Sequence, residues 1–218
     1  MTDSRKPIRS YVIHQGRISD RQKRALVELW DQYGLEAIGG RIDPQHHFEI
    51  NQPITIEIGF GMGDSLVEMA SRHSARNFIG IEVHKPGIGR LLREVHDRSL
   101  TNLRVYAKDS LEVLGANITR SSIECIQIFF PDPWPKRRHH KRRLVNLKFL
   151  EIVASCLASD GILHIATDWV PYAEKIQALL EKDDRFEITH PPDRPLTKYE
   201  RRGMDLGHRV TDIAFRKI

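Results

Sequence analysis

The sequence predicts an α/β fold in which a mainly parallel β-sheet is covered by helices on both faces. From Pro53 onward, short apolar runs alternate with longer segments whose apolar residues recur at helical spacing. The chain has 218 residues, 40% of them hydrophobic, which suits one α/β domain and leaves little room for a second. We therefore assign residues 51–218 to a single globular domain and residues 1–50 to a basic N-terminal arm with one helix.

Each element of this fold has its own local pattern. A helix is expected over residues 19–33, because Ser19 can cap its start and Gly34 ends it. Apolar residues at helical spacing predict further helices over residues 64–73, from Pro86, over 144–157 and over 171–180. Seven short apolar runs predict the strands, at residues 54–58, 78–83, 103–107, 123–130, 162–167, 186–189 and 209–215. Because parallel sheets bind ligands beyond the carboxyl ends of their strands, the residues that follow the first five strands are the candidates for a site.

The positive charge of the chain is concentrated in residues 136–143, which read Lys-Arg-Arg-His-His-Lys-Arg-Arg. The net charge is +5, yet without this segment 28 basic residues face 29 acidic ones. Such a localised patch indicates a polyanion partner, although a solvated loop has the same composition. His139 and His140 lack the cysteine partners and the spacing of a zinc site, so no metal is expected.

The remaining composition indicates a cytoplasmic protein. Cys125 and Cys156 both stand in apolar surroundings, so we expect two buried core residues and no disulfide framework. The first nine residues lack an apolar signal segment, and no apolar run approaches membrane-spanning length. No membrane partner is therefore expected, and the chain is predicted to be a monomer or a weak homodimer.

The first strand ends in a glycine-rich segment, Glu57-Ile-Gly59-Phe-Gly61-Met-Gly63-Asp64. Glycines at this place allow a tight turn and let a ligand lie against the main chain, although a plain strand-to-helix turn has the same composition. Asp64 stands where a dinucleotide fingerprint has glycine or alanine, and its charge disfavours a pyrophosphate at the helix start. The loop therefore favours a nucleoside ligand without phosphates.

Acidic residues follow the next three strands. Glu82 lies 19 residues beyond Gly63, near the spacing at which an acid accepts hydrogen bonds from ribose hydroxyls. Asp109 can either bind an adenine edge or cap the helix that follows it. Residues 129–136 read Phe-Phe-Pro-Asp-Pro-Trp-Pro-Lys, and three prolines stiffen the backbone around Asp132. We interpret Asp132 as a functional residue; the alternative is a rigid turn plugged by Trp134.

The glycine loop and the acids that follow it resemble the class I S-adenosylmethionine-dependent methyltransferases, which have a Rossmann-like fold. The proline motif with its basic tail is more specific and resembles the signature of the tRNA (guanine-N7)-methyltransferase family. Further matches are Gly80-Ile-Glu-Val-His84, Ala166-Thr-Asp-Trp169, Thr197-Lys-Tyr-Glu200, Arg202-Gly203 and Leu206-Gly-His208. The likeness runs from about Arg9 to the C-terminus. One departure is Thr211, where the family usually has tryptophan, which implies a change of packing in the last strand.

The resemblance implies transfer of a methyl group from S-adenosylmethionine to N7 of a guanine in tRNA, guanine 46 of the variable loop. We predict Asp132 as the catalytic residue, whose carboxylate accepts hydrogen bonds from guanine N1–H and the exocyclic amine. The implied cofactor-binding residues are Glu57, Gly59, Gly61, Gly63, Glu82, Asp109 and Asp132. The implied substrate-binding residues are Lys136, Asp168, Thr197, Lys198, Tyr199 and Glu200. The basic residues expected to bind RNA are Arg137, Arg138, Lys141, Arg142 and Arg143.

Other interpretations stay open at this point. Asp168 can also cap the helix that starts near Pro171, and Tyr199 is either a base-stacking or an ordinary surface aromatic. A nicotinamide-dependent oxidoreductase shares the fold and the ribose acid, but Asp64 disfavours it. A non-catalytic RNA-binding module is disfavoured by the acids after four strands. A methyltransferase for a small molecule leaves the basic run unexplained.

Overall fold

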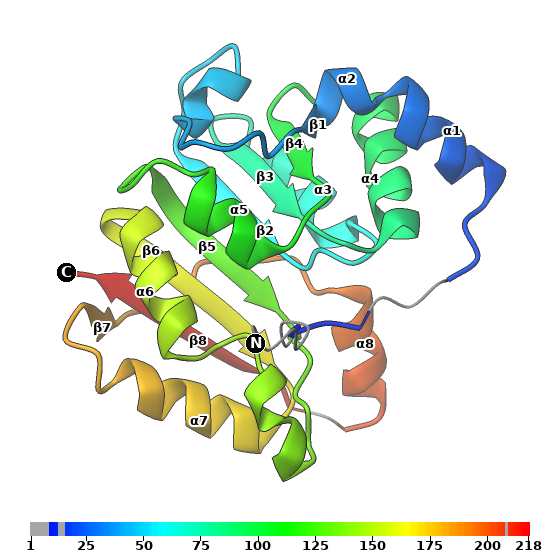
Figure 1. The fold of residues 1–218 in the computed structure, drawn as a ribbon. Helices are drawn as coiled ribbons and strands as arrows, with labels where there is room; N and C mark the ends of the chain where they lie inside the picture. Colours follow the sequence, from blue (N-terminus) through cyan, green and yellow to red (C-terminus); the bar gives the residue numbers. More distant parts are fainter. Residues whose placement is uncertain (1–8, 13–15, 208) are drawn as a thin grey trace, which may run out of the picture.

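The computed structural model describes residues 9–12, 16–207 and 209–218, and these form one sheet of eight strands (Figure 1). The strand order is β1-β4-β3-β2-β5-β6-β8-β7. In chain order the strands are β1 (Gly34–Leu35), β2 (Ile54–Ile58), β3 (Asn77–Ile81), β4 (Leu103–Tyr106), β5 (Ile123–Phe129), β6 (Leu157–Thr167), β7 (Phe186–Ile188) and β8 (Thr211–Lys217). Strand β8 alone runs opposite to the other strands, because its pairs with β6 and β7 are both antiparallel. The predicted mainly parallel sheet is confirmed, with the two-residue β1 added to the seven expected strands.

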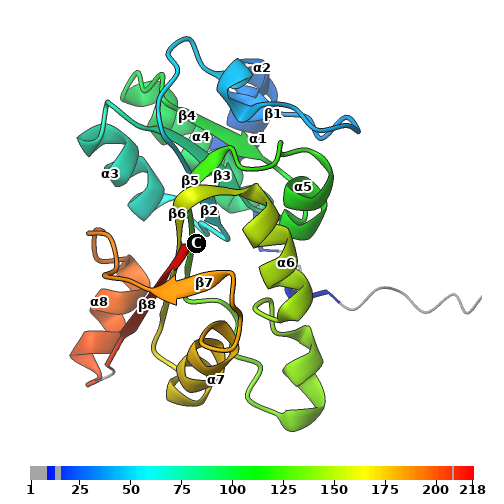
Figure 2. The same cartoon turned by 90° about the vertical axis from the view of Figure 1, so that its left-hand side faces the viewer.

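Helices cover both faces of the sheet, and each face has its own apolar core. One core contains side chains of α5 (Ser110–Ala116), α6 (Leu147–Cys156) and α7 (Val170–Leu180). The other contains side chains of α1 (Asp20–Glu28), α3 (Asp64–Arg72) and α4 (Lys85–Asp97). In Figure 2 the sheet separates α5 and α6 from α3 and α8 (Lys198–Asp205). Every residue of β2 is buried, including the polar Thr55 and Glu57 that alternate with its three isoleucines, because helices cover both faces of the sheet.

The N-terminal segment packs into the edge of this domain. The helix expected over residues 19–33 is divided at Leu29 into α1 and α2 (Trp30–Tyr33), and Gly34 ends α2 as expected. Ser19 caps α1 in a reciprocal capping box with Gln22. Helix α1 lies against α4 at Gly89, where a Cβ would stand 2.5 Å from the Gln22 carbonyl oxygen. The first eight residues of the arm lie outside the described residues.

Three further elements differ from the sequence expectation. Helix α6 begins at Leu147 and not at residue 144, because the Asn146 side chain accepts from the Phe149 amide and caps the helix there. Strand β6 begins at Leu157, five residues before the expected start, with a register shift against β5. Helix α8 was not expected at all, since its sequence is polar. Two 3-10 helices, η1 (Pro44–His47) and η2 (Arg137–Arg142), complete the fold.

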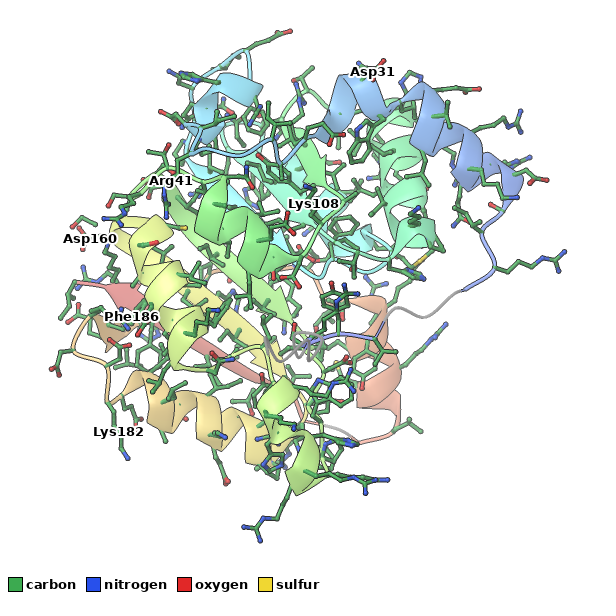
Figure 3. The ribbon with its side chains drawn as sticks, in the orientation of Figure 1. Asp31, Arg41, Lys108, Asp160, Lys182 and Phe186 are labelled. Atoms are coloured by element: carbon green, nitrogen blue, oxygen red, sulfur yellow. The ribbon has the colours of Figure 1, made fainter. Side chains whose placement is uncertain are left out.

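The loop that leads into β2 is tied to the end of α5. Arg41 donates to the carbonyl oxygens of Ile118, at 2.6 Å, and of Gly115, at 2.9 Å (Figure 3).

Cys125 and Cys156 are free and buried, as expected of core residues, and burial raises the pKa of the Cys125 thiol to about 12. Among the described residues, no helix is both long and apolar enough to cross a membrane.

Candidate active site

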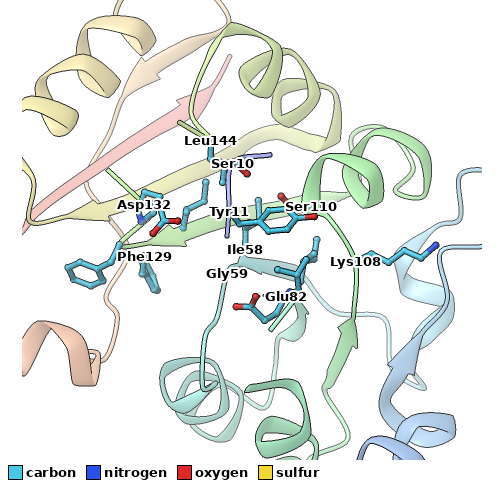
Figure 4. Close-up of a pocket in the computed structure, with 15 residues that line it drawn as sticks. Ser10, Tyr11, Ile58, Gly59, Glu82, Lys108, Ser110, Phe129, Asp132 and Leu144 are labelled. Atoms are coloured by element: carbon cyan, nitrogen blue, oxygen red, sulfur yellow. Dashed lines mark hydrogen bonds between the residues drawn. The ribbon is translucent and has the colours of Figure 1, made fainter. Parts of the chain in front are cut away.

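A pocket of ≈ 210 Å³ opens at the carboxyl ends of β2, β3, β4 and β5, the edge that the sheet topology predicts (Figure 4). Gly59 after β2, Glu82 after β3 and Asp132 after β5 all line it. Lys108 and Ser110, on either side of Asp109, line it as well. The fold thus gathers residues from four strand ends, which are far apart in the sequence, around one cavity.

The glycine loop needs its glycines for two different reasons. Gly59, Gly61 and Gly63 have φ values of 73°, 58° and 81°, a region that other residues rarely adopt. A Cβ at Gly59 or Gly61 would meet no atom within 4 Å, and of these two glycines Gly59 lines the pocket. A Cβ at Gly63 would lie 2.7 Å from Leu91, and one at Gly87 only 1.8 Å from the Gly61 carbonyl oxygen. Glycine therefore allows both exposure to the pocket and close packing of α4 against the loop.

Glu82 is fixed in the pocket by backbone donors. Its Oε2 accepts from the Gly61 amide at 2.9 Å, and its Oε1 accepts from the Val83 and His84 amides at 2.6 and 3.0 Å. These bonds join the end of β3 to the glycine loop after β2. The carboxylate is therefore held rigidly at the position where the sequence pattern expects a group for ribose hydroxyls.

Asp109 caps a helix and stands between two lining residues, Lys108 and Ser110, without lining the pocket itself. Its side chain accepts from the Leu111 amide at 2.8 Å and caps α5. The Tyr11 hydroxyl also donates a hydrogen bond to Asp109, and burial followed by the charge of this carboxylate raises the pKa of Tyr11. Figure 4 shows the Tyr11 ring among the lining side chains, between Asp132 and Ser110. A residue of the N-terminal arm thus forms part of the pocket.

Glu57 lies beneath the glycine loop and does not line the pocket. Its side chain is buried on the α3 face of β2, where the Gln127 Nε2 donates to Oε2 at 2.8 Å. Burial raises the pKa of this carboxyl to about 7, while the Gln127 hydrogen bond lowers it. The side chain of Glu57 is therefore paired with Gln127 in the interior, at the position where the resemblance implied a cofactor contact.

The segment that carries Asp132 is strained at both ends. Phe130 and Trp134 are non-glycine residues with positive φ values, 54° and 44°. The Phe130 amide donates to the Ala166 carbonyl oxygen at 2.8 Å, and the Trp134 indole donates to the Ser10 carbonyl oxygen at 3.0 Å. The predicted rigid turn is therefore held by contacts to β6 and to the arm, and Asp132 lies exposed at its centre.

Helix α8 brings a second group of predicted residues to the rim of the pocket. The Tyr199 hydroxyl donates to Asp168 Oδ2 at 3.2 Å, and the Tyr199 ring centroid lies 5.0 Å from that of Phe130, a lining residue. Thr197 caps the helix in a reciprocal box with Glu200. Lys198 forms an ion pair with Asp64, 3.1 Å apart. Asp168 and Tyr199 are thus adjacent to the pocket, while Thr197, Lys198 and Glu200 do not line it.

Arg194, which was not among the predicted site residues, anchors this helix. It pairs with Glu200 and with Asp212 in β8, at shortest distances of 2.6 and 2.7 Å. Its guanidinium carbon lies 5.0 Å from the Phe129 ring centroid. Although burial raises the pKa of Asp212, hydrogen bonds from His164 and Arg194 bring it down to about 2. The predictive signal was weak, because Arg194 stands in a polar, proline-containing segment without periodicity.

The basic run divides into exposed and buried residues. Lys136, Arg137, Arg138 and Lys141 are exposed. Arg142 stacks on Trp134, 3.9 Å from the ring centroid, and donates to the arm carbonyl oxygens of Arg9 and Tyr11. Arg143 is only 4% exposed, so its side chain is not presented to solvent as those of the other predicted RNA contacts are, and its contact with RNA phosphates stays a prediction. Its Nε donates to the Pro133 carbonyl oxygen at 2.8 Å.

Within the described residues, no cluster of three His, Cys, Asp or Glu side chains is arranged to hold a metal ion.

Comparison with known proteins adds sequence and fold relatives. The family described as "Putative methyltransferase" matches residues 51–213. The tRNA (guanine-N(7)-)-methyltransferase of Chromohalobacter salexigens is 47% identical, over 97% of this chain and 90% of its own. That of Thiobacillus denitrificans is 46% identical, over 98% and 97%. A 30S ribosomal A1408 methyltransferase from an uncultured bacterium superposes with a TM-score of 0.52 over 95% of this chain and 98% of its own, at 14% identity. A "putative methyltransferase" of Streptococcus mutans in complex with SAH superposes with a TM-score of 0.53 over 77% and 90%, at 11% identity.

The strand order, the glycine loop after β2 and the pocket at the strand ends are together those of a class I methyltransferase. Sequence similarity over nearly the full length, at 46–47% identity, identifies the family more specifically than the fold does. The chain belongs to the tRNA (guanine-N7)-methyltransferase family.

Proposed function

We propose that this methyltransferase transfers a methyl group from S-adenosylmethionine to N7 of a guanine in tRNA, with guanine 46 of the variable loop as the target. The observation that carries the proposal is the position of Asp132. It lies at the rim of the pocket formed by the glycine loop, and the chain continues from it directly into the exposed basic residues of the run. A pocket for a nucleoside and a surface for a polyanion therefore meet at one carboxylate.

The pocket fits a nucleoside cofactor without phosphates. Gly59 lines the pocket and has no atom within 4 Å of its Cβ position, and Glu82, bound to the Gly61 amide, presents a carboxylate in the same pocket. Asp64, at the start of α3, is paired with Arg90 and Lys198, and its charge occupies the helix end that a pyrophosphate would need. We infer that Glu82 binds the ribose hydroxyls and that Asp109, freed from Tyr11, receives the adenine edge.

S-adenosylmethionine supplies an electrophilic methyl group. Guanine N7 has an in-plane lone pair and no proton, so its attack on that methyl group requires no general base. The residues around Asp132 must then orient the base, and the ring becomes cationic as the bond forms. A carboxylate that accepts from N1–H and the exocyclic amine both orients guanine and stabilises this charge. Asp168 and Tyr199, joined by their hydrogen bond at the same rim, are placed to contact the base or its ribose.

The exposed part of the basic run supplies the phosphate contacts. Lys136, Arg137, Arg138 and Lys141 carry no acidic partner in the ion pairs of the described residues, so their charges face solvent. Electrostatic contacts of this kind give affinity for a nucleic acid without sequence information. Recognition of guanine is therefore assigned to the pocket, and retention of tRNA to the run.

The proposal is tested by incubating the purified chain with methyl-labelled S-adenosylmethionine and an unmodified tRNA transcript, followed by nucleoside analysis. We expect label in 7-methylguanosine alone. A matched transcript with adenine in place of guanine 46 should accept no label. Label in another nucleoside contradicts N7 chemistry, and equal labelling of the two transcripts contradicts the position.

A further inference from the structure

One residue of the basic run faces the protein interior. The Arg143 side chain is buried, its Nε donates to the Pro133 carbonyl oxygen at 2.8 Å, and its guanidinium carbon lies 4.6 Å from the centroid of the Tyr172 ring. Sequence neighbours such as Arg137 and Lys141 are exposed. Arg143 therefore uses its charge and its planar donors within the protein, where a phosphate does not reach it.

The carbonyl that Arg143 binds belongs to the strained segment around Asp132. A residue held at an unfavourable φ costs about 1–3 kcal/mol and persists only where its surroundings impose the conformation. Phe130 and Trp134 are both in this state. Pro131 and Pro133 fix their own φ angles but cannot impose the values on their neighbours. The geometry of the segment must therefore be held from outside.

Hydrogen bonds hold the segment at three places, in addition to the ring contacts of Trp134 with Arg142 and of Phe130 with Tyr199. The Phe130 amide is bound to β6 through the Ala166 carbonyl, and the Trp134 indole is bound to the Ser10 carbonyl of the arm. Arg143 binds the carbonyl oxygen of Pro133, the residue that directly follows Asp132. The first two contacts act at the ends of the segment, whereas that of Arg143 acts one residue from the carboxylate.

The guanidinium group of Arg143 packs on the ring of Tyr172, which is itself held in place. Tyr172, on α7, is fully buried, and its hydroxyl accepts from the Val145 amide at 3.2 Å. Burial raises the pKa of Tyr172 to about 12; the charge of Arg143 lowers this pKa and that of Asp132 raises it. Both charges thus act on the same buried hydroxyl. Only an arginine combines a flat face for the ring with a directed Nε donor for the carbonyl, and a lysine has neither.

We propose that Arg143 is a positioning residue for methyl transfer, which holds the Pro133–Trp134 peptide so that the Asp132 carboxylate faces the pocket. This inference rests on the role proposed for Asp132. It divides the basic run by function, because the exposed cations retain RNA while Arg143 orders the segment that orients guanine.

The test compares three variants of the full chain, Arg143→Lys, Arg137→Gln and Arg185→Lys. Arg185, paired with Asp183 at the far end of α7, is the matched control for the Arg-to-Lys change. We measure kcat and KM for a tRNA transcript, the salt dependence of tRNA binding, and hydrogen–deuterium exchange in peptides that cover residues 130–136. Arg143→Lys should lower kcat at least tenfold, leave the salt slope as in the wild type and speed exchange in that segment. Arg137→Gln should flatten the slope by about 0.7–0.9 without faster exchange.

The outcomes separate this inference from the proposed function. An unchanged kcat or unchanged exchange for Arg143→Lys, or a salt slope flattened by about 0.7–0.9 for the charge-removing variant Arg143→Gln, overturns the positioning role. If the wild type transfers no methyl group to tRNA, the proposed function fails, while the exchange data still decide whether Arg143 holds the segment. Arg143→Gln, with the same expected results, replaces the lysine variant if that variant melts below the assay temperature. Arg185→Lys should match the wild type throughout.

Discussion

Arg194 donates two hydrogen bonds to Glu200, from Nη1 to Oε2 at 2.6 Å and from Nη2 to Oε1 at 3.0 Å. Both side chains are buried, with 7% and 6% of their surface exposed. Glu200 also accepts from the Thr197 amide and thereby closes the cap of α8. The carboxylate is thus engaged in fixing the helix that brings Tyr199 to the pocket rim. Its effect on substrate is expected to pass through the position of that helix.

Replacement of Glu200 by glutamine should therefore weaken both α8 and tRNA use. A buried charged hydrogen bond contributes about 1.5–3 kcal/mol, and for a chain of this length each kcal/mol corresponds to roughly 2–4 °C in Tm. We expect a lower Tm and a KM for tRNA that is raised severalfold, with cofactor affinity as in the wild type. Thermal melts, steady-state kinetics and calorimetry check these values. Glu187→Gln, at an exposed pair with Arg216, is the control. An unchanged KM for Glu200→Gln would contradict the anchoring role.

Glu57→Gln should stabilise the protein at alkaline pH and do little at acid pH. Burial raises the pKa of Glu57 from 4.5 to about 7, so the folded chain holds the proton more tightly than the unfolded chain. The contribution of the protonated Glu57 side chain to the free energy of unfolding is therefore fully present below pH 4.5 and is lost as the pH rises through 7. Above pH 7 the loss amounts to about 3 kcal/mol. Urea unfolding should give the variant a gain of this order at pH 8 and less than about 1 kcal/mol at pH 5. Equal gains at the two pH values would refute the buried, protonated state.

The two glutamates near the glycine loop should differ in their effect on the cofactor. Glu82 lines the pocket, whereas Glu57 lies below the loop. Loss of a charged hydrogen bond costs about 1.5–3 kcal/mol, or roughly tenfold to a hundredfold in affinity. Calorimetric titration with S-adenosylhomocysteine should show this loss for Glu82→Gln and a smaller one for Glu57→Gln. A larger loss of affinity for Glu57→Gln than for Glu82→Gln would contradict the assignment of the ribose hydroxyls to Glu82.

Neutralising the exposed cations should flatten the salt dependence of tRNA binding. Each phosphate contact contributes about 0.7–0.9 to the log–log slope, so Arg137, Arg138 and Lys141 together should contribute about 2–3. The triple glutamine variant is compared with Lys182→Gln, which changes a cation beyond the end of α7 (Figure 3). Filter binding over a range of salt concentrations measures the slopes. Cofactor affinity should be unaffected, and a triple variant with the wild-type slope would exclude the run as the tRNA surface.

Much of the fold follows from local sequence pattern, because its central elements are apolar. Strand β2 was predicted with its observed bounds, and Ser19 caps α1 as expected. Helix α8 escaped prediction because its residues are polar and its position depends on Arg194, which pairs with Asp212 in another part of the chain. Strand β1 has two residues, too few for any periodicity.

The site was predictable where residues follow strand ends, and less so where tertiary contacts decide. The topology brings Gly59, Glu82 and Asp132 to one pocket, as the rule for parallel sheets predicts. The place of Tyr11 in that pocket has no local signal, since the arm reaches it from over 40 residues upstream of the glycine loop. Arg143 belongs by composition to the exposed run, and only its packing on Tyr172 separates it.

The most direct test of the account is the single-turnover rate of methyl transfer to unmodified tRNA by Asp132→Asn. Asparagine keeps the size of the side chain but removes the charge and one acceptor, so transition-state stabilisation should fall by about 3–4 kcal/mol, or roughly a hundredfold to a thousandfold in rate. We predict this fall with melting temperature and tRNA affinity close to those of the wild type. A variant that transfers the methyl group at nearly the wild-type rate would contradict the central role of Asp132.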